Sequence, residues 1–177
     1  MFATLLRFAS ILTLLFTISF AAFAQNSSPK TTVTSFYKFD RSHSQTFERK
    51  AIDARKGWLS PELYALFIKE LEREKEYLKQ NPTDKPFFCD GLPFRALDES
   101  CTEGKRSVRK QLTIGEQVEE EAEATVKVAF AFPKPCKEPD VSEYTIRLVK
   151  SKSGWVIDNV IYSAESNLVK DLNRTSY

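Results

Sequence analysis

The hydrophobic pattern of the chain changes twice along its length. Residues 8–20 are mostly apolar, residues 31–80 repeat apolar side chains at three- and four-residue steps, and residues 105–161 alternate apolar with polar side chains. An apolar run near the start is typical of a secretory signal, a period near 3.6 indicates amphipathic helices, and a period of two indicates strands with one covered face. The pattern therefore predicts an α+β fold with N-terminal helices followed by an antiparallel sheet.

The helical part divides at strong local signals. A first helix is predicted over Thr31–Phe47 and a short amphipathic stretch over Glu48–Lys56. Ser60-Pro61-Glu62 then starts a second long helix, because Ser caps free amides, Pro fits the first helical position and Glu complements the positive helix end. Asn81-Pro82 ends this helix, since Pro disfavours helical geometry at the residue before it.

The second long helix combines an apolar face with a run of charges. Its apolar face is predicted to be Leu63, Phe67, Leu71 and Leu78. The charged run 70–76 alternates in sign, so we expect it to be solvent exposed, with pairs such as Glu76 with Lys79. A partner-binding face is the alternative function for this run.

Four strands and a short C-terminal helix are predicted from residue 105 onward. Hairpin turns are expected at 115–118 and 151–154, where Gly is combined with polar residues. The run of glutamates at 119–123 either blunts a strand end or forms an acidic patch for a cationic partner. The predicted elements are strands at 108–114, 124–132, 144–148 and 155–161, and a helix at 166–174.

The first 24 residues have the three regions of a cleavable secretory signal. Arg7 supplies the positive charge, residues 8–20 are the apolar region, and Ala22-Phe23-Ala24 has the spacing that signal peptidase requires. Cleavage predicts a mature chain of residues 25–177 that forms a single α+β domain without a stable membrane anchor. An uncleaved anchor is the alternative, because the apolar run is near the lower length limit for a span.

The charge balance argues against polyanionic partners. The chain has 26 basic and 24 acidic side chains, and the predicted signal contains only Arg7 among them. The predicted mature chain is therefore almost neutral, which argues against nucleic acid and against an anionic membrane surface as partners. A protein exported by a signal of this kind is expected in the periplasm or outside the cell.

Residues 81–104 form a long irregular stretch. Loops of more than about 15 residues are uncommon in compact domains and are often functional. Its apolar residues are Phe87, Phe88, Leu92, Phe94 and Leu97, which are expected to pack on the core. The stretch is either a lid over the open end of the core or a segment that carries Asp90, Asp98 or Glu99 into a pocket.

Three cysteines in an exported protein leave one over when two pair. We predict the pair Cys89–Cys101, because both lie in the long loop, which has the least regular structure to hold it. The rival pair is Cys101–Cys136, because Cys136 lies in a Pro-rich connector only a few residues out of the expected strand register.

Motifs for enzymes are scarce. The chain has no Gly-rich phosphate loop, no C-x-x-C, no H-E-x-x-H and no G-x-S-x-G. A single His excludes a multi-His metal site, and neither a metal nor a cofactor is expected. Asp40 and His43 have the spacing of an acid–base pair on a helix face, although a surface or half-buried histidine is the simpler interpretation.

The order of elements resembles a known superfamily. Helix, helix, long loop and a meander ending in Gly154-Trp155-Val156-Ile157-Asp158 look like the nuclear transport factor two-like superfamily, a cone-shaped α+β fold. The segments 33–37, 59–63 and 86–94 are similar to a bacterial domain-of-unknown-function family of exported proteins. The resemblance implies a curved sheet, Trp155 and Ile157 in the core, and a pocket between the sheet and the helices, but it implies no activity.

Two hypotheses for function follow. The first is a non-enzymatic module that binds a small molecule or an envelope protein, and it requires no catalytic group. The second is a cofactor-free isomerase, dehydratase or hydrolase that uses a carboxylate in the pocket. The pocket candidates are Phe36, Tyr37, Asp90, Phe94 and Tyr144.

Overall fold

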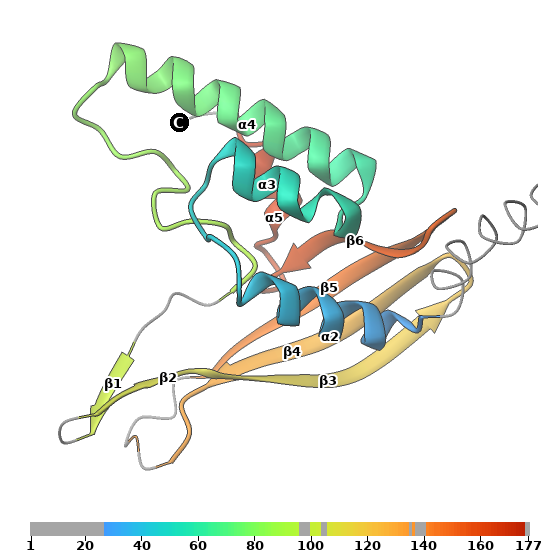
Figure 1. Cartoon of the computed structure of the whole chain (residues 1–177). Helices are drawn as coiled ribbons and strands as arrows, with labels where there is room; N and C mark the ends of the chain where they lie inside the picture. The colour runs from blue at the N-terminus through green and yellow to red at the C-terminus, as the bar shows by residue number, and fades with distance from the viewer. Residues whose placement is uncertain (1–26, 96–99, 104–105, 135, 137–140, 176–177) are drawn as a thin grey trace, which may run out of the picture.

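Helices cover one face of an antiparallel sheet. The computed structural model describes residues 27–95, 100–103, 106–134, 136 and 141–175. Helices α2 (Pro29–Asp40), α3 (Arg49–Arg55) and α4 (Pro61–Gln80) lie on one side of a four-stranded sheet, and helix α5 (Leu168–Leu172) follows the last strand (Figure 1). The predicted α+β fold class is confirmed. The predicted signal at 1–24 lies outside the described residues.

Helix α2 is shorter than predicted at its C-terminal end. Ser28 caps its start by accepting a hydrogen bond from the Thr31 amide at 3.1 Å. The helix ends at Asp40, so the predicted continuation to Phe47 is wrong. The hydroxyl of Ser42 donates to the Phe39 carbonyl at 2.8 Å. Such side-chain bonds compete with the helical backbone pattern.

Helix α4 begins and ends where the local signals predict. Ser60 is its N-cap and its hydroxyl oxygen accepts from the Leu63 amide at 3.0 Å. The predicted exposure of the charged run is wrong at two positions, because Glu70 and Glu74 are buried on the same face as Leu63 and Phe67. The predicted exposed pair of Glu76 with Lys79 does form, at 2.9 Å.

The main sheet is a meander of neighbouring strands. Its strands are β3 (Gln111–Glu120), β4 (Glu123–Ala131), β5 (Val141–Ser151) and β6 (Gly154–Ile161), in that order. The first hairpin turns at residues 121–122, so the predicted turn at 115–118 is wrong. Gly115 instead lies within β3 at a shift of register against β4, which is where an extra residue bends a strand. The last turn, at 151–154, is confirmed.

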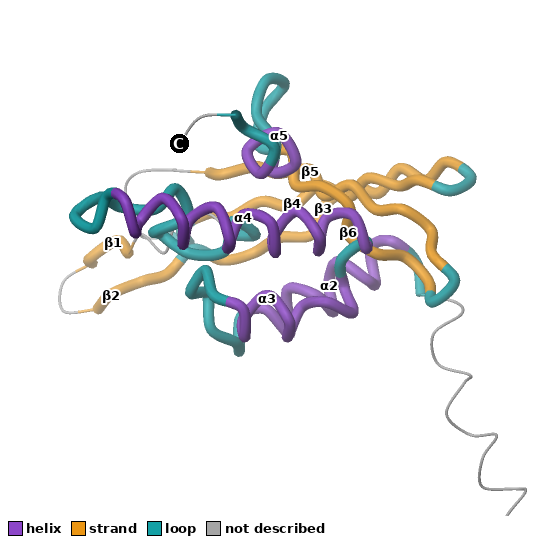
Figure 2. Tube along the Cα trace, turned by 90° about the horizontal axis from the view of Figure 1, so that it is seen from above, coloured by secondary structure: helices purple, strands orange, loops and turns teal. Residues whose placement is uncertain are grey.

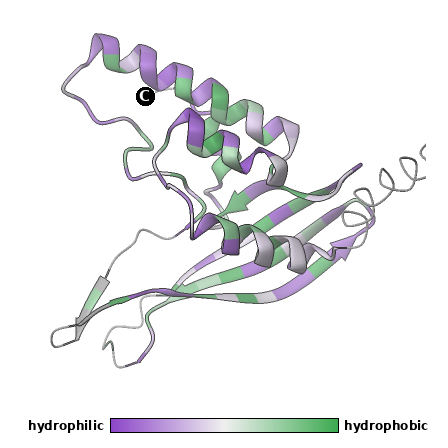
Figure 3. Cartoon of the chain, in the orientation of Figure 1, coloured by the Kyte–Doolittle hydropathy of each residue, from purple (hydrophilic) through white to green (hydrophobic). Residues whose placement is uncertain are grey.

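The core lies between the inner face of the sheet and the helices. Val126, Ile146 and Ile157 are fully buried, and Trp155 is largely buried. Burial of Trp155 and Ile157 in β6 agrees with what the resemblance implied. Hydrophobic and hydrophilic residues follow one another along the strands of the main sheet (Figure 3), as expected for strands with one covered face. Burial of the apolar side chains is the main favourable contribution to folding.

A small hairpin extends beyond one end of the main sheet. It consists of β1 (Ser100–Glu103) and β2 (Arg106–Arg109), which form a separate two-stranded sheet (Figures 1 and 2). Cys101 of β1 forms a disulfide with Cys136 after β4, with the Cα atoms 6.2 Å apart. The preferred pair Cys89–Cys101 is therefore wrong, and Cys89 is a free, exposed thiol. A disulfide is compatible with an oxidising compartment.

Candidate functional site

The pocket loop, residues 86–95, is held in place by hydrogen bonds from three directions. The Phe88 amide donates to Oε1 of Glu74 in α4 at 3.1 Å. The Leu92 amide donates to the Gln45 carbonyl at 2.7 Å. The phenol of Tyr37 in α2 donates to the Phe94 carbonyl at 2.8 Å. Burial raises the pKa of Tyr37 well above its ordinary value, so the phenol stays a donor.

Gly91 allows the pocket loop to approach Gln45 closely. Its φ of +107° is a conformation that side-chain-bearing residues rarely adopt, and a Cβ at this position would lie 2.5 Å from the Gln45 carbonyl oxygen. The neighbouring Leu92 makes the hydrogen bond to that carbonyl. The path of the loop at this point therefore depends on glycine.

The loop borders an open cavity, here called the loop pocket, together with β5, β6 and α5. Its volume is about 320 Å³. The lining residues are Gln45, Phe87, Phe88, Asp90, Gly91, Leu92, Pro93, Arg95, Tyr144, Tyr162 and Asp171. Aromatic walls with a few converging polar groups are typical of small-molecule sites, and the volume lies at the small end of their range.

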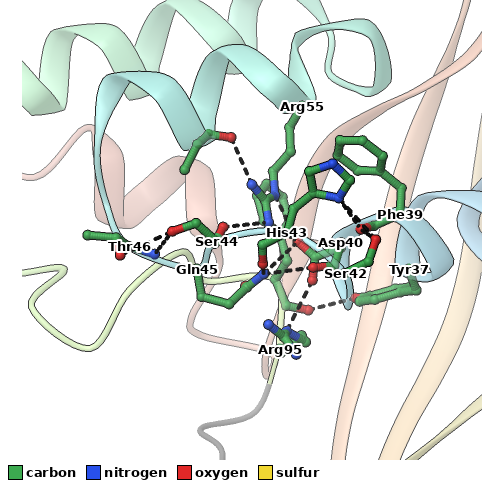
Figure 4. Close-up of polar contacts among 12 residues, drawn as sticks. Tyr37, Phe39, Asp40, Ser42, His43, Ser44, Gln45, Thr46, Arg55 and Arg95 are labelled. Atoms are coloured by element: carbon green, nitrogen blue, oxygen red, sulfur yellow. Dashed lines mark hydrogen bonds and ion pairs between the residues drawn. The ribbon is translucent and has the colours of Figure 1, made fainter.

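A buried charge cluster lies beside the pocket (Figure 4). The carboxylate of Asp40 is fully buried and accepts from Nε of Arg55 at 2.8 Å, and Nε of Arg95 lies 3.1 Å from its second oxygen. Gln45 donates to the carbonyl and the carboxylate of Asp40. Asp40 and Arg55 have no exposed side-chain surface, whereas 17% of the Arg95 side chain is exposed. Arg95 thus connects the cluster to the pocket.

A second cluster fixes the C-terminal segment against the pocket loop. The buried carboxylate of Glu70 pairs with Arg73 in the same helix and with Nη2 of Arg174 at 2.5 Å. The Arg174 guanidinium lies 3.7 Å from the ring centroid of Phe87, which gives a cation–π contact. Glu70 and Glu74 can be buried within the charged run because each has a partner there: Arg73 and Arg174 for Glu70, and the Phe88 amide for Glu74.

Two titratable groups of the pocket are affected by burial. Desolvation raises the pKa of Asp171 above its ordinary value, with opposing contributions from Arg174 and Lys170. Desolvation also raises the pKa of Tyr162, whose hydroxyl lies 3.4 Å from the Pro93 carbonyl. Burial disfavours the charged form of both groups.

The structure separates the pocket candidates into two layers. Asp90 and Tyr144 line the loop pocket. Phe36, Tyr37 and Phe94 are fully buried in the core, where the rings of Phe36 and Phe94 lie 5.0 Å apart. Of the other loop residues, Phe88 and Leu92 are buried and Phe87 is exposed, while Leu97, Asp98 and Glu99 lie outside the described residues.

Sequence reasoning missed Gln45, Arg95, Tyr162 and Asp171 as lining residues. Arg95 directly follows the buried Phe94 at the end of an apolar run, and this position was a usable sequence signal that Arg95 lies close to the core. Asp171 and Tyr162 gave no such signal, because their place in the pocket depends on how α5 turns back after β6.

His43 and Asp40 do not form an acid–base pair. The His43 ring stacks on Phe39 at 3.7 Å between centroids, and its Nδ1 lies 2.7 Å from the Phe39 carbonyl oxygen. The Asp40 carboxylate faces Arg55, Arg95 and Gln45 instead (Figure 4). His43 is exposed, which agrees with the simpler interpretation of a surface histidine.

A second hollow, of about 650 Å³, lies along the strands of the main sheet. Its charged residues are Glu116, Lys127 and Glu143, which are all exposed. Glu116 and Lys127 pair with each other at 3.4 Å. The loop pocket, by contrast, adjoins the buried side chains of Asp40, Arg55 and Arg95, so it is the better candidate for a binding site.

Comparisons with protein-family models, with curated proteins and with solved structures found no match to this chain. In the part of the chain that the structure describes, no three His, Cys, Asp or Glu side chains gather as a metal site. None of the described helices is long and apolar enough to cross a membrane.

Proposed function

We propose that this chain is an exported, non-enzymatic binding module of the bacterial cell envelope, built on the nuclear transport factor two-like fold, and that the loop pocket holds a small molecule. The observation that carries the proposal is the construction of this pocket. An irregular loop is held by Glu74, Gln45 and Tyr37 so that aromatic walls and three charged side chains converge on one cavity. Such convergence is a property of ligand sites rather than of ordinary surface loops.

The lining supports binding more than catalysis. The described residues around the pocket include no His, Cys, Ser or Lys, so a serine or cysteine nucleophile activated by a histidine or lysine base has no place there. The disulfide of Cys101 with Cys136 is compatible with the oxidising compartment that an exported protein enters.

The alternative function is a cofactor-free isomerase, dehydratase or hydrolase. One observation favours it: burial raises the pKa of Asp171, and a carboxyl with a raised pKa is suited to proton transfer. The two functions differ in what Asp171→Asn does. A binding module with this change still binds its ligand or binds it more weakly, whereas an enzyme that depends on Asp171 binds its substrate and no longer converts it.

Native mass spectrometry of the protein purified from its own host tests the proposal. We expect a bound small molecule that is lost from Asp90→Trp, because the indole fills the pocket from its exposed rim. Asp84→Trp is the matched control, since Asp84 lies before the pocket loop, is exposed and does not line the pocket. The absence of any retained ligand, or equal retention by both variants, contradicts the proposal.

A further inference from the structure

The buried cluster beside the loop pocket has more positive than negative charge. One carboxylate, Asp40, faces the two guanidinium groups of Arg55 and Arg95, and all three side chains are at least four-fifths buried. Arg55 also donates to the carbonyls of Ala51 and Ser44. Among the described residues, no side chain or carbonyl accepts from the terminal nitrogens of Arg95. A guanidinium with an open fork matches the geometry of a carboxylate.

The same pocket offers negative charge at other positions. Asp90 of the pocket loop and Asp171 of α5 both line it. No described residue donates a hydrogen bond to either carboxylate, although the positive charges of Arg174 and Lys170 also act on Asp171. Oε1 of Gln45 is buried and without a partner in the described part of the chain, whereas its Nε2 has three acceptors. These three groups accept hydrogen bonds, and an ammonium group supplies three donors.

The charges and walls of the pocket together restrict the ligand. A simple anion would approach Asp90 and Asp171, and a simple cation would approach Arg95, so either is repelled on one side. Resting on the proposed function, we propose that the loop pocket binds a small zwitterion, with its carboxylate on Arg95 and its ammonium on Asp171 and Asp90. The rings of Phe88, Tyr144 and Tyr162 take up an apolar or aromatic group.

Isothermal titration calorimetry with three matched probes tests this ligand class. L-Phenylalanine carries both charges, 3-phenylpropionate carries only the carboxylate, and phenethylamine carries only the ammonium, on nearly the same carbon skeleton. On the unaltered full-length mature protein we expect L-phenylalanine to bind at least tenfold more tightly than either one-charge probe. Equal affinity for all three, or tighter binding of a one-charge probe, overturns the proposal.

Two variants assign each charge to its partner. Arg95→Gln should remove the advantage of L-phenylalanine over phenethylamine, because the carboxylate loses its receptor. Asp171→Asn should remove most of its advantage over 3-phenylpropionate, because the ammonium loses a receptor. Asp84→Asn, outside the pocket, should leave all three affinities unchanged. Because the comparison of probes on the unaltered protein already decides the ligand class, the proposal stays testable if Arg95→Gln does not fold.

The failure of this inference differs from the failure of the proposed function. If none of the probes binds while the host-purified protein retains another molecule that Asp90→Trp loses, the zwitterion class is wrong and the pocket still binds a ligand. If no probe binds and no host molecule is retained, both proposals are wrong.

Discussion

At the residue scale, the most deeply buried ion pair of the described residues joins Asp40 to Arg55. Neither side chain has exposed surface, and Nε of Arg55 donates a hydrogen bond to Oδ1 of Asp40 at 2.8 Å. Taking two charges out of water is costly, so the pair is weak evidence for net stabilisation, but removal of one partner leaves an uncompensated charge. The pair also orients Arg95 through the second oxygen of Asp40.

The change Arg55→Met tests this dependence. We expect it to lower the free energy of unfolding by about 3–5 kcal/mol. The buried Asp40 carboxylate would keep only Arg95 as an ionic partner, and the carbonyls of Ala51 and Ser44 would lose the donor that Arg55 supplies. Urea denaturation followed by circular dichroism measures the effect. The matched control is Arg49→Met, which removes an exposed pair with Asp53 and should have a much smaller effect on stability. Equal losses in the two variants would contradict a special role for the buried pair.

The change Asp171→Asn tests whether the raised pKa of Asp171 makes the stability of the protein depend on pH. Because burial raises the pKa of Asp171 in the folded state, its contribution to stability is fully present below the unfolded pKa, about 4, and is lost as pH rises through the folded pKa. We therefore expect Asp171→Asn to melt higher than the unaltered protein at pH 7. The difference should disappear near pH 3.5, as followed by scanning calorimetry. A lower melting temperature at pH 7 would contradict the stated burial effect.

At the element scale, boundaries that depend on local sequence signals were predicted correctly, whereas features that depend on long-range contacts were not. The start of α4 at Pro61 and the turn before Gly154 were predictable, because capping and turn chemistry act within a few residues. The first hairpin was misplaced, because a Gly that produces a bulge and a Gly that produces a turn look alike in sequence. Glu70 and Glu74 were misassigned because the partners that allow their burial, Arg174 and the Phe88 amide, are remote or lie in the loop.

The change Gly91→Ala tests whether the pocket loop depends on its close contact with Gln45. We expect a loss of at least about 1 kcal/mol in unfolding free energy, because both the positive φ and the short contact disfavour a Cβ. Gly57→Ala is the control: a Cβ there meets nothing within 4 Å, so this change should be neutral or slightly stabilising. Chemical denaturation of both variants provides the comparison, and equal stability would show that the loop tolerates a side chain.

The change of Cys101 and Cys136 together to Ser tests the crosslink. Their sequence separation of 35 residues corresponds to about 4 kcal/mol in the chain-entropy treatment of disulfides, and we expect a loss of up to this amount. Cys89→Ser should leave unfolding within about 0.5 kcal/mol of the unaltered protein, because this thiol is free and exposed. Non-reducing peptide mapping should yield the Cys101–Cys136 peptide, and a dominant Cys89 crosslink would contradict the structure.

The cysteine pairing also shows why sequence proximity misled. Cys89 and Cys101 are near each other in sequence, so the loop between them seemed the segment in greatest need of a crosslink. In the fold, the pocket loop is already held by Glu74, Gln45 and Tyr37. Cys101 belongs instead to β1, beside the connector that follows β4. The disulfide therefore links the small hairpin to that connector and leaves the pocket loop to noncovalent contacts.

At the scale of the whole molecule, the fold class followed from periodicity, whereas the candidate site did not. Helical and alternating patterns are local averages, so errors at single boundaries do not change the class. The loop pocket depends on five separate segments: the turn after α2, the pocket loop, β5, the end of β6, and α5. Only Asp90 and Tyr144 among its lining residues were sequence candidates, because tertiary packing alone brings Arg95 and Asp171 to the same cavity.

The proposed export sets the compartment in which the loop pocket would meet its proposed ligand, and it gives the last prediction. Ala22-Phe23-Ala24 supplies the small residues that signal peptidase requires, so the exported chain should begin at Gln25. Intact-mass measurement of protein recovered from the periplasm or medium should show the loss of residues 1–24. Ala24→Leu should block this cleavage, whereas Phe23→Leu should not, because the middle position of the site has no size requirement. Met1 retained on the exported, unaltered protein would instead indicate an uncleaved anchor and place the loop pocket beside a membrane.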